Sequence, residues 1–318
     1  ASDAINNMTF LRYKLINKAT DRIQRCYFAK WVDPDLGCYT DDYIGCDTTH
    51  VFTQFGPKPR NLMYIYNSDA TDGTSGCTCN GGSGTYCNDI PILGVDYFRG
   101  PFGPDTTQVG EPLVELGMSS FTYMVNGGDP GVNTAMTDPS RGRPIEFYYY
   151  LSARWRDGTP VTVGGNGYNP TGTPTRYVFP GAPNDPNGWS MCSEALPQGD
   201  YRTVQATGPM RLDPGAKNEL IVGTVWVPDI VYPCPNISSF LQADDIAQSL
   251  FDACFNIPDG PDAPNMCIVE LDEELIINLS NPTDANIHNN AREEYSEGII
   301  PNPGVSDSLY LFEGYKLY

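Results

Sequence analysis

Apolar and polar residues alternate along many short segments of this chain, and that pattern predicts a mainly β protein. Strands are expected at residues 8–17, 25–32, 61–66, 90–98, 202–212, 218–227, 266–271 and 274–279, with another from residue 309 onward. Clusters of Gly, Pro, Asn and Asp separate these segments, as is typical of turns. The segments 202–212 and 218–227 are expected to pair with each other through the turn that begins at Asp213.

Two segments have the spacing of apolar residues that predicts a helix. Residues 144–155 are the first, and residues 239–255 are the second and clearer one. In the second, apolar side chains such as Phe240 recur every three or four positions, so they share one face. Asp244 and Asp245 are then expected on the side that faces the solvent.

A stiff segment rich in Pro, Gly and Asp, residues 258–264, divides the chain into two parts, and 318 residues suffice for two domains. Residues 1–257 are expected to form an antiparallel, jelly-roll-like β-sandwich with a Cys-rich insertion and a C-terminal helix. Residues 258–318 are expected to be a linker followed by the first strands of a second β-sandwich. Because the chain stops within a strand pattern, we expect it to be part of a longer protein.

Composition narrows the choice of partners. The net charge is −20 at pH 7, and only 18% of the residues are charged. No basic patch is present to neutralise phosphates, which disfavours nucleic acid and anionic lipid as partners. No apolar run is long enough to span a membrane, and residues 1–7 lack the pattern of a signal peptide. This balance favours a rigid, secreted protein.

Ten cysteines in a chain of this length indicate an oxidising compartment. Zinc is disfavoured because Cys77 and Cys79 are too close in sequence for the usual ligand pair, and no paired histidines follow. Disulfides are therefore expected. By proximity in the sequence, the predicted pairs are Cys38 with Cys46, Cys234 with Cys254, and Cys87 with either Cys77 or Cys79.

Aspartates crowd into residues 33–47, with no Lys or Arg among them. Carboxylates so close together repel one another, and their pKa values rise unless a positive charge lies between them. A divalent cation supplies that charge, and Ca²⁺ takes about six to eight oxygen ligands from flexible loops. Gly37 permits a sharp turn within the segment. The members of the group are Asp33, Asp35, Asp41, Asp42 and Asp47.

Asn67, Asp69 and Asp72 follow the strand expected at residues 61–66 and form a second group of oxygen ligands. A neighbouring antiparallel strand can bring the two groups side by side. The sequence thus predicts a Ca²⁺ site, with a solvated acidic loop as the alternative interpretation. The flanking aromatic residues and cysteines favour the site, because they indicate a rigid, partly buried loop.

Catalytic motifs are missing from the sequence. The two histidines, His50 and His288, lie in no zinc-protease pattern, and residues 82–84 lack the spacing of a nucleophile elbow. Many carboxylates are present, yet no pattern selects a glycosidase pair. We therefore expect a protein without catalytic activity. The alternative is a carbohydrate-binding or polysaccharide-processing accessory protein. It is suggested by a group of aromatic residues, which could instead serve to pack the core: Tyr148, Tyr149, Tyr150, Trp155, Tyr168, Tyr177 and Trp189.

Taken in order, several segments resemble the long, largely uncharacterised surface proteins of Bacteroidota that are exported by the type nine secretion system. They are residues 8–17, 31–47, 94–101, 155–160, 162–168, 208–215, 242–254 and 259–264. The resemblance implies an extracellular, cell-surface location and an immunoglobulin-like module of the fibronectin-III kind after residue 258. It also implies that the partners are other modules of the parent chain and the secretion or surface-attachment machinery, with glycans as further candidates.

Three tripeptides, which begin at Asp47, Asp105 and Asp307, resemble the O-glycosylation signal of the same phylum. Asp47 is already a candidate metal ligand, so Thr106 and Ser308 are the expected acceptors. The function that the sequence favours is that of a non-catalytic, calcium-binding, extracellular surface or adhesion module of a larger secreted protein.

Overall fold

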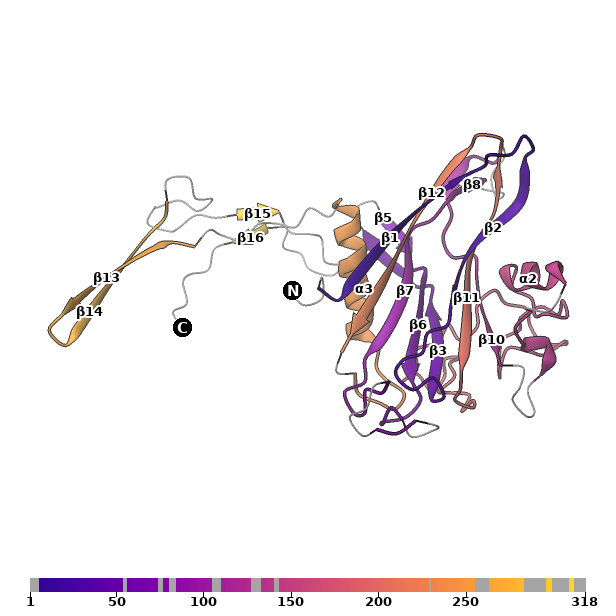
Figure 1. Ribbon diagram of the computed structural model, residues 1–318, viewed down its shortest axis with the longest axis horizontal. Helices are drawn as coiled ribbons and strands as arrows, with labels where there is room; N and C mark the ends of the chain where they lie inside the picture. Colours follow the sequence, from indigo (N-terminus) through magenta and orange to yellow (C-terminus); the bar gives the residue numbers. More distant parts are fainter. Residues whose placement is uncertain are drawn as a thin grey trace. The chain divides into compact units, whose positions relative to one another are not determined.

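The computed structural model describes residues 6–53, 56–73, 77–79, 84–104, 110–126, 133–139, 143–228, 230–254, 263–282, 296–298 and 309–311. In these ranges the chain is mainly β, with antiparallel sheets and two α-helices (Figure 1). It divides into two compact units, one of Ala1–Val51 and Pro57–Ala247, the other of Phe52–Gly56 and Gln248–Tyr318. The predicted domain boundary after residue 257 falls among residues that the structure does not describe.

The first unit contains a five-stranded antiparallel sheet. Its strands lie in the order β1 (Met8–Ile16), β12 (Lys217–Val227), β7 (Ile92–Arg99), β6 (Leu62–Asn67) and β3 (Asp42–Asp47) (Figure 1). Every residue of β6 and β3 is buried. Strands that are covered on both faces carry apolar residues in both directions, which explains why β3 shows no simple alternation.

A three-stranded antiparallel sheet packs against one face of the first. It is formed by β10 (Ser120–Val125), β11 (Tyr201–Leu212) and β2 (Ile23–Val32). Its central strand is tied to the first sheet by Gln205, whose Nε2 donates to the carbonyl of Val95 at 3.1 Å. The hydroxyl of Tyr97 donates to the carbonyl of Gln205 at 2.7 Å. These buried bonds fix the two sheets relative to each other.

Helix α3 (Ser238–Asp252) lies on the opposite face of the five-stranded sheet (Figure 1). The Phe240 ring packs where β7 has Gly94, and a Cβ added there would come within 2.4 Å of that ring. The Phe240 and Tyr64 ring centroids lie 5.8 Å apart. Glycine at this point of β7 therefore lets the helix approach the sheet closely.

The expectation that Asp244 and Asp245 face the solvent is wrong, because both are buried. Asp245 accepts two bonds from Arg60 Nη2, at 2.6 and 2.7 Å. Asp96, on β7, is the charged residue that most raises the pKa of Asp244. The helix thus places two acidic residues against the sheet one turn after Phe240.

Helix α2 (Pro144–Leu151) packs beside β10 in the second sheet. The hydroxyl of Ser120 donates to the carbonyl of Leu151 at 2.9 Å. Helix α2 ends at Leu151, so it is shorter than the helix that the sequence predicts over residues 144–155. Trp155 lies outside it, fully buried, in a turn where its backbone N–H donates to the Thr159 carbonyl at 2.8 Å. A 3₁₀ helix, η1 (Thr134–Met136), precedes α2.

The remaining strands are short or belong to the second unit. They are β4 (His50–Thr53), β5 (Gly56–Pro59), β8 (Phe102–Pro104), β9 (Leu113–Glu115), β13 (Asn265–Leu271), β14 (Glu274–Ser280), β15 (Ser296–Gly298) and β16 (Leu309–Leu311). β13 and β14 form an antiparallel hairpin, and β15 pairs with β16 in antiparallel fashion.

Most of the expected strands are present, but the predicted pairing of residues 202–212 with 218–227 is wrong. β11 pairs with β10 and β2, whereas β12 pairs with β1 and β7, so the turn at Asp213 carries the chain from one sheet to the other. The jelly-roll and fibronectin-III assignments stay predictions. In the described ranges, no helix combines the length and the apolar character that crossing a membrane requires.

Candidate metal centre

Asp42 and Asn67 face each other across two neighbouring strands. Asp42 begins β3, Asn67 ends β6, and the antiparallel register places them directly opposite each other. Opposed residues of an antiparallel pair project their side chains from the same face of the sheet, with Cβ atoms about 5 Å apart. Asp42 is 2% exposed and Asn67 0% exposed, so water does not solvate either polar group.

Each of these two side chains keeps one buried oxygen that no hydrogen-bond donor of the described residues reaches, namely Asp42 Oδ1 and Asn67 Oδ1. Their other polar atoms are engaged. Asp42 Oδ2 accepts from the Leu36 N–H at 3.1 Å, and Asn67 Nδ2 donates to the Asp69 carbonyl at 3.0 Å. An unsatisfied buried polar atom costs about 1–3 kcal/mol. Two such atoms on facing residues indicate a position for a cation or a proton.

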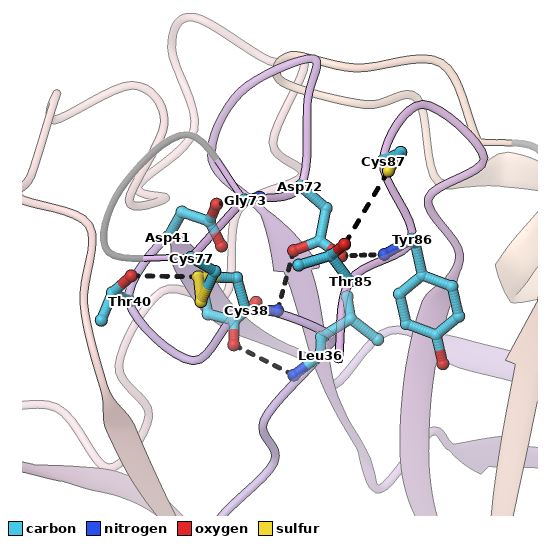
Figure 2. Close-up of a disulfide and its surroundings, with 11 residues drawn as sticks. Leu36, Cys38, Thr40, Asp41, Asp72, Gly73, Cys77, Thr85, Tyr86 and Cys87 are labelled. Atoms are coloured by element: carbon cyan, nitrogen blue, oxygen red, sulfur yellow. Dashed lines mark hydrogen bonds between the residues drawn. A yellow bond between two sulfur atoms is a disulfide. The ribbon is translucent and has the colours of Figure 1, made fainter. Parts of the chain in front are cut away.

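Two further buried carboxylates, Asp41 and Asp72, are near enough for their charges to raise the pKa of Asp42. One oxygen of each lies within 4.8 Å of the other and of the Cys38 sulfur (Figure 2). That sulfur is bonded to Cys77, so the two carboxylates supply the metal-ligating atoms. Asp41 Oδ2 accepts from the Gly73 N–H at 2.8 Å, and Asp72 Oδ1 accepts from the Cys38 N–H at 2.8 Å. These backbone bonds hold both carboxylates in position.

The charges in this cluster act on one another. Burial raises the pKa of the Asp42 carboxyl well above its usual value, and the charges of Asp41 and Asp72 raise it further, while the Leu36 N–H lowers it. These surroundings therefore favour a proton or a cation at Asp42 over an unpaired charge. We call this group the buried acidic cluster; its members are Asp41, Asp42, Asn67 and Asp72.

The loop before β3 reaches the cluster because residue 37 is glycine. Gly37 has a φ of +74°, in the left-handed region that other residues rarely adopt. A Cβ at this position would come within 2.0 Å of Asp72 Oδ2. The loop can therefore pass this carboxylate only without a side chain.

A second acidic group, Asp33, Asp35 and Asp200, could also hold a metal ion, since their carboxylate oxygens lie within 4.8 Å of one another. The first two are exposed. Arg202 pairs with Asp33 at 3.3 Å and with Asp200 at 2.9 Å, so the chain itself supplies positive charge here. Sequence reasoning missed Asp200, because only the pairing of β11 with β2 brings it to this place.

The residues predicted to form one calcium cage are therefore distributed over separate places. In the buried acidic cluster Asp41 lies beside Asp72 of the second predicted group and Asp42 lies opposite Asn67, whereas Asp33 and Asp35 belong to the exposed group.

Asp47 and Asp69 have structural bonds of their own. Asp47 ends β3, about 16 Å along the strand from Asp42 at about 3.3 Å per residue. Its Oδ1 accepts from the Thr49 N–H at 2.8 Å. Asp69 Oδ1 accepts from the Thr71 N–H at 2.9 Å, which closes the turn after β6. Asp47 is thus too far along the strand to share an ion with Asp42.

Three disulfides form, Cys38–Cys77, Cys79–Cys87 and Cys192–Cys234. The second of them is one of the two alternatives expected for Cys87. Disulfides of this number are typical of proteins from an oxidising compartment.

The predicted pair of Cys38 with Cys46 is wrong, because Cys46 lies inside β3 and its thiol donates to the Val178 carbonyl at 3.3 Å. The predicted pair of Cys234 with Cys254 is also wrong. Cys234 is bonded to Cys192 instead, and Cys254, which follows helix α3, is a free, exposed thiol.

Two of the seven aromatic residues considered for carbohydrate binding, Tyr150 and Trp155, belong to the core, and the other five are partly exposed. Trp155 and Tyr150 are fully buried, so their ring faces cannot stack on a sugar. Trp189 packs against Phe179, with ring centroids 5.4 Å apart. The expected glycan acceptors, Thr106 and Ser308, lie outside the residues that the structure describes.

Comparison of the chain with protein-family models, with curated proteins and with solved structures finds no match.

Proposed function

We propose that the first unit is a non-catalytic β-sandwich module, stabilised by one Ca²⁺ ion, of a secreted surface or adhesion protein. The observation that carries this proposal is the pair of unsatisfied buried oxygens on Asp42 and Asn67, beside the carboxylates of Asp41 and Asp72. Carboxylate and amide oxygens are the ligands that Ca²⁺ prefers, and backbone carbonyls or water complete its shell.

A calcium ion would reduce the repulsion among the carboxylates of the cluster. Three carboxylates carry three negative charges in a buried place, and a divalent cation leaves one of them uncompensated. Burial makes each unpaired charge expensive, so the ion should contribute strongly to stability. The metal is Ca²⁺ rather than zinc because the available donors are oxygens and the nearest sulfurs are in disulfides.

The surface and adhesion role is supported by the three disulfides, by the net charge of −20, and by the segments that resemble exported surface proteins of Bacteroidota. In this role the module serves as a rigid spacer or docking element of a longer chain. The jelly-roll connectivity of the first unit and the fibronectin-III-like character of the second are parts of the same proposal.

A shared proton is the alternative occupant of the cluster. A protonated Asp42 would donate to Asn67 Oδ1 and satisfy both oxygens without a metal. The variant Asp42→Asn separates the two cases, because its amide group mimics the protonated acid but is a poor substitute for a calcium ligand. If a proton occupies the site, this variant should be as stable as the wild type or more so.

The test is thermal unfolding of the full chain in chelator and again with calcium restored. At a calcium concentration of about 100 times Kd, binding adds about 2.7 kcal/mol, which raises Tm by about 5–10 °C for a unit of this size. Asp42→Asn should lose that response. Asp47→Asn is the matched control, on the same strand but about 16 Å away, and should keep it. An unchanged wild-type Tm would contradict the proposal.

A further inference from the structure

Two disulfides meet at the short segment that contains Cys77 and Cys79. Cys77 is bonded to Cys38, in the loop before β3, and Cys79 is bonded to Cys87, after the Gly/Ser-rich segment. The two loops are thus joined covalently through three residues of chain. We call the bonds Cys38–Cys77 and Cys79–Cys87 the disulfide clasp.

Asp72 is held by backbone groups from both sides of this clasp (Figure 2). Its carboxylate accepts from the N–H of Cys38 at 2.8 Å and from the N–H of Tyr86. Its own N–H donates to the Cys87 carbonyl at 2.8 Å. Every one of these partners is a clasp cysteine or the direct neighbour of one, so the position of Asp72 depends on where the clasp holds the two loops.

The composition of the chain between Gly73 and Thr85 offers little that would hold the loops together. This stretch is made of Gly, Ser, Thr, Asn and Cys, with no large apolar side chain that could be buried. Residues of these types lose much conformational entropy when they are ordered, and they bury little apolar surface in return. In addition, the carboxylates of Asp41 and Asp72 repel each other at their close approach. Without the clasp, the repulsion between the two carboxylates and the entropy of the loop would both move Asp72 away from Asp41.

We propose that metal binding at the buried acidic cluster is conditional on oxidation of the disulfide clasp. The inference rests on the proposed function, since it concerns the regulation of the same site. Each clasp bond forms when two thiols lose two electrons and two protons to a disulfide reagent or a protein disulfide, which becomes a dithiol. Reduction by a dithiol reverses the exchange and releases Asp72 from the cluster.

Calcium binding by the chain would then depend on whether the surrounding compartment is reducing or oxidising. In a reducing compartment the cluster lacks Asp72 and has low affinity for calcium, so the chain stays without its ion. After the chain reaches an oxidising, calcium-containing environment, the clasp closes and the ion binds. The rigid form of the module then arises only where it is used.

The experiment measures calcium affinity of the full chain by competition with a fluorescent chelator, with calcium chloride as the probe. Three oxidised proteins are compared: the wild type, the double variant Cys79→Ser/Cys87→Ser, and the control Cys192→Ser/Cys234→Ser. The control lacks a disulfide that is not part of the clasp. Far-UV circular dichroism shows whether each protein remains folded.

We expect the clasp variant to bind calcium about tenfold more weakly than the wild type or worse, while the control stays within about threefold. Treatment of the wild type with dithiothreitol should weaken binding at least as much as the clasp variant does. Equal affinity of the clasp variant and the wild type overturns the inference and leaves the calcium site intact. Equal losses in both double variants also overturn it, because they indicate a general effect of lost stability. If the oxidised wild type binds no calcium, the proposed function itself fails.

Discussion

Asp42 and Asn67 lie directly opposite each other at one end of the β3–β6 pair, and each retains a buried side-chain oxygen without a donor. Most buried polar groups in proteins are hydrogen-bonded, so an opposed pair of exceptions calls for a ligand or a proton. The neighbouring Asp41 and Asp72 add two carboxylates that could hold a metal ion.

Gly37 provides a test of the loop geometry. In Gly37→Ala, the Cβ would lie within 2.0 Å of Asp72 Oδ2, in a backbone conformation with φ +74°. We expect this variant to lose about 2–4 kcal/mol of unfolding free energy and most of its calcium response, from combined backbone strain and steric conflict. Gly215→Ala is the matched control, with φ +76° and no atom within 4 Å of its Cβ. It should lose only the strain term of about 1–2 kcal/mol and keep its calcium response. Chemical denaturation with and without calcium measures both, and equal losses would contradict this reading of the loop.

The buried acids between α3 and the sheet predict how stability depends on pH. Burial raises the pKa of Asp96 to about 7, and burial together with the charge of Asp96 raises the pKa of Asp244 well above its usual value. The folded protein therefore holds more protons than the unfolded chain between about pH 4 and 7. The free energy of unfolding that these two groups contribute should fall as pH rises through this window, and level off above the folded pKa values.

Asp244→Asn removes one of these two acids and should flatten that pH dependence. At pH 8 we expect the variant to be more stable than the wild type by about 1–2 kcal/mol, because it lacks one buried charge. Asp245→Asn is the control on the adjacent residue, where the bond to Arg60 is lost. It should be less stable than the wild type at both pH values, because Arg60 loses its partner. Urea unfolding at pH 5 and pH 8 tests this, and a loss of stability in Asp244→Asn at pH 8 would count against it.

Peptide mapping under non-reducing conditions should recover the three observed disulfides. Cys46 is buried, so we expect its thiol to react with iodoacetamide only after unfolding, whereas Cys254 should react in the native protein. Burial also raises the pKa of the Cys46 thiol well above its usual value, which lowers the fraction of reactive thiolate. A peptide that links Cys38 to Cys46 would contradict the structure of the loop before β3.

Much of the β architecture could be predicted from the sequence, because strands such as β12 and β7 combine apolar runs with clear turn residues on either side. Where β3 lies, the sequence predicts only an acidic hairpin. A strand that is buried on both faces shows no alternation of apolar and polar residues by which it could be identified. Helical spacing predicts Asp244 in solvent because it identifies only the most apolar face, but polar residues beside that face can also be buried.

The candidate metal site could be predicted only in part. Crowded aspartates suggested a cation, and Asn67 and Asp72 were recognised as nearby oxygen ligands, but the sequence could not show which of them share one place. Register decides this: Asp42 is opposite Asn67, whereas Asp47 is opposite Leu62. Two of the predicted disulfides are wrong for a related reason. Closeness in sequence does not indicate which thiols a strand or a helix separates in space.

The most direct test of the central claim is isothermal titration of calcium chloride into chelator-stripped, oxidised protein, with the wild type compared with Asp42→Asn. The buried acidic cluster predicts saturable binding of one ion by the wild type and loss of that binding in the variant. No binding by the wild type, or binding of the same affinity by Asp42→Asn, would contradict the assignment of calcium to Asp42 and Asn67.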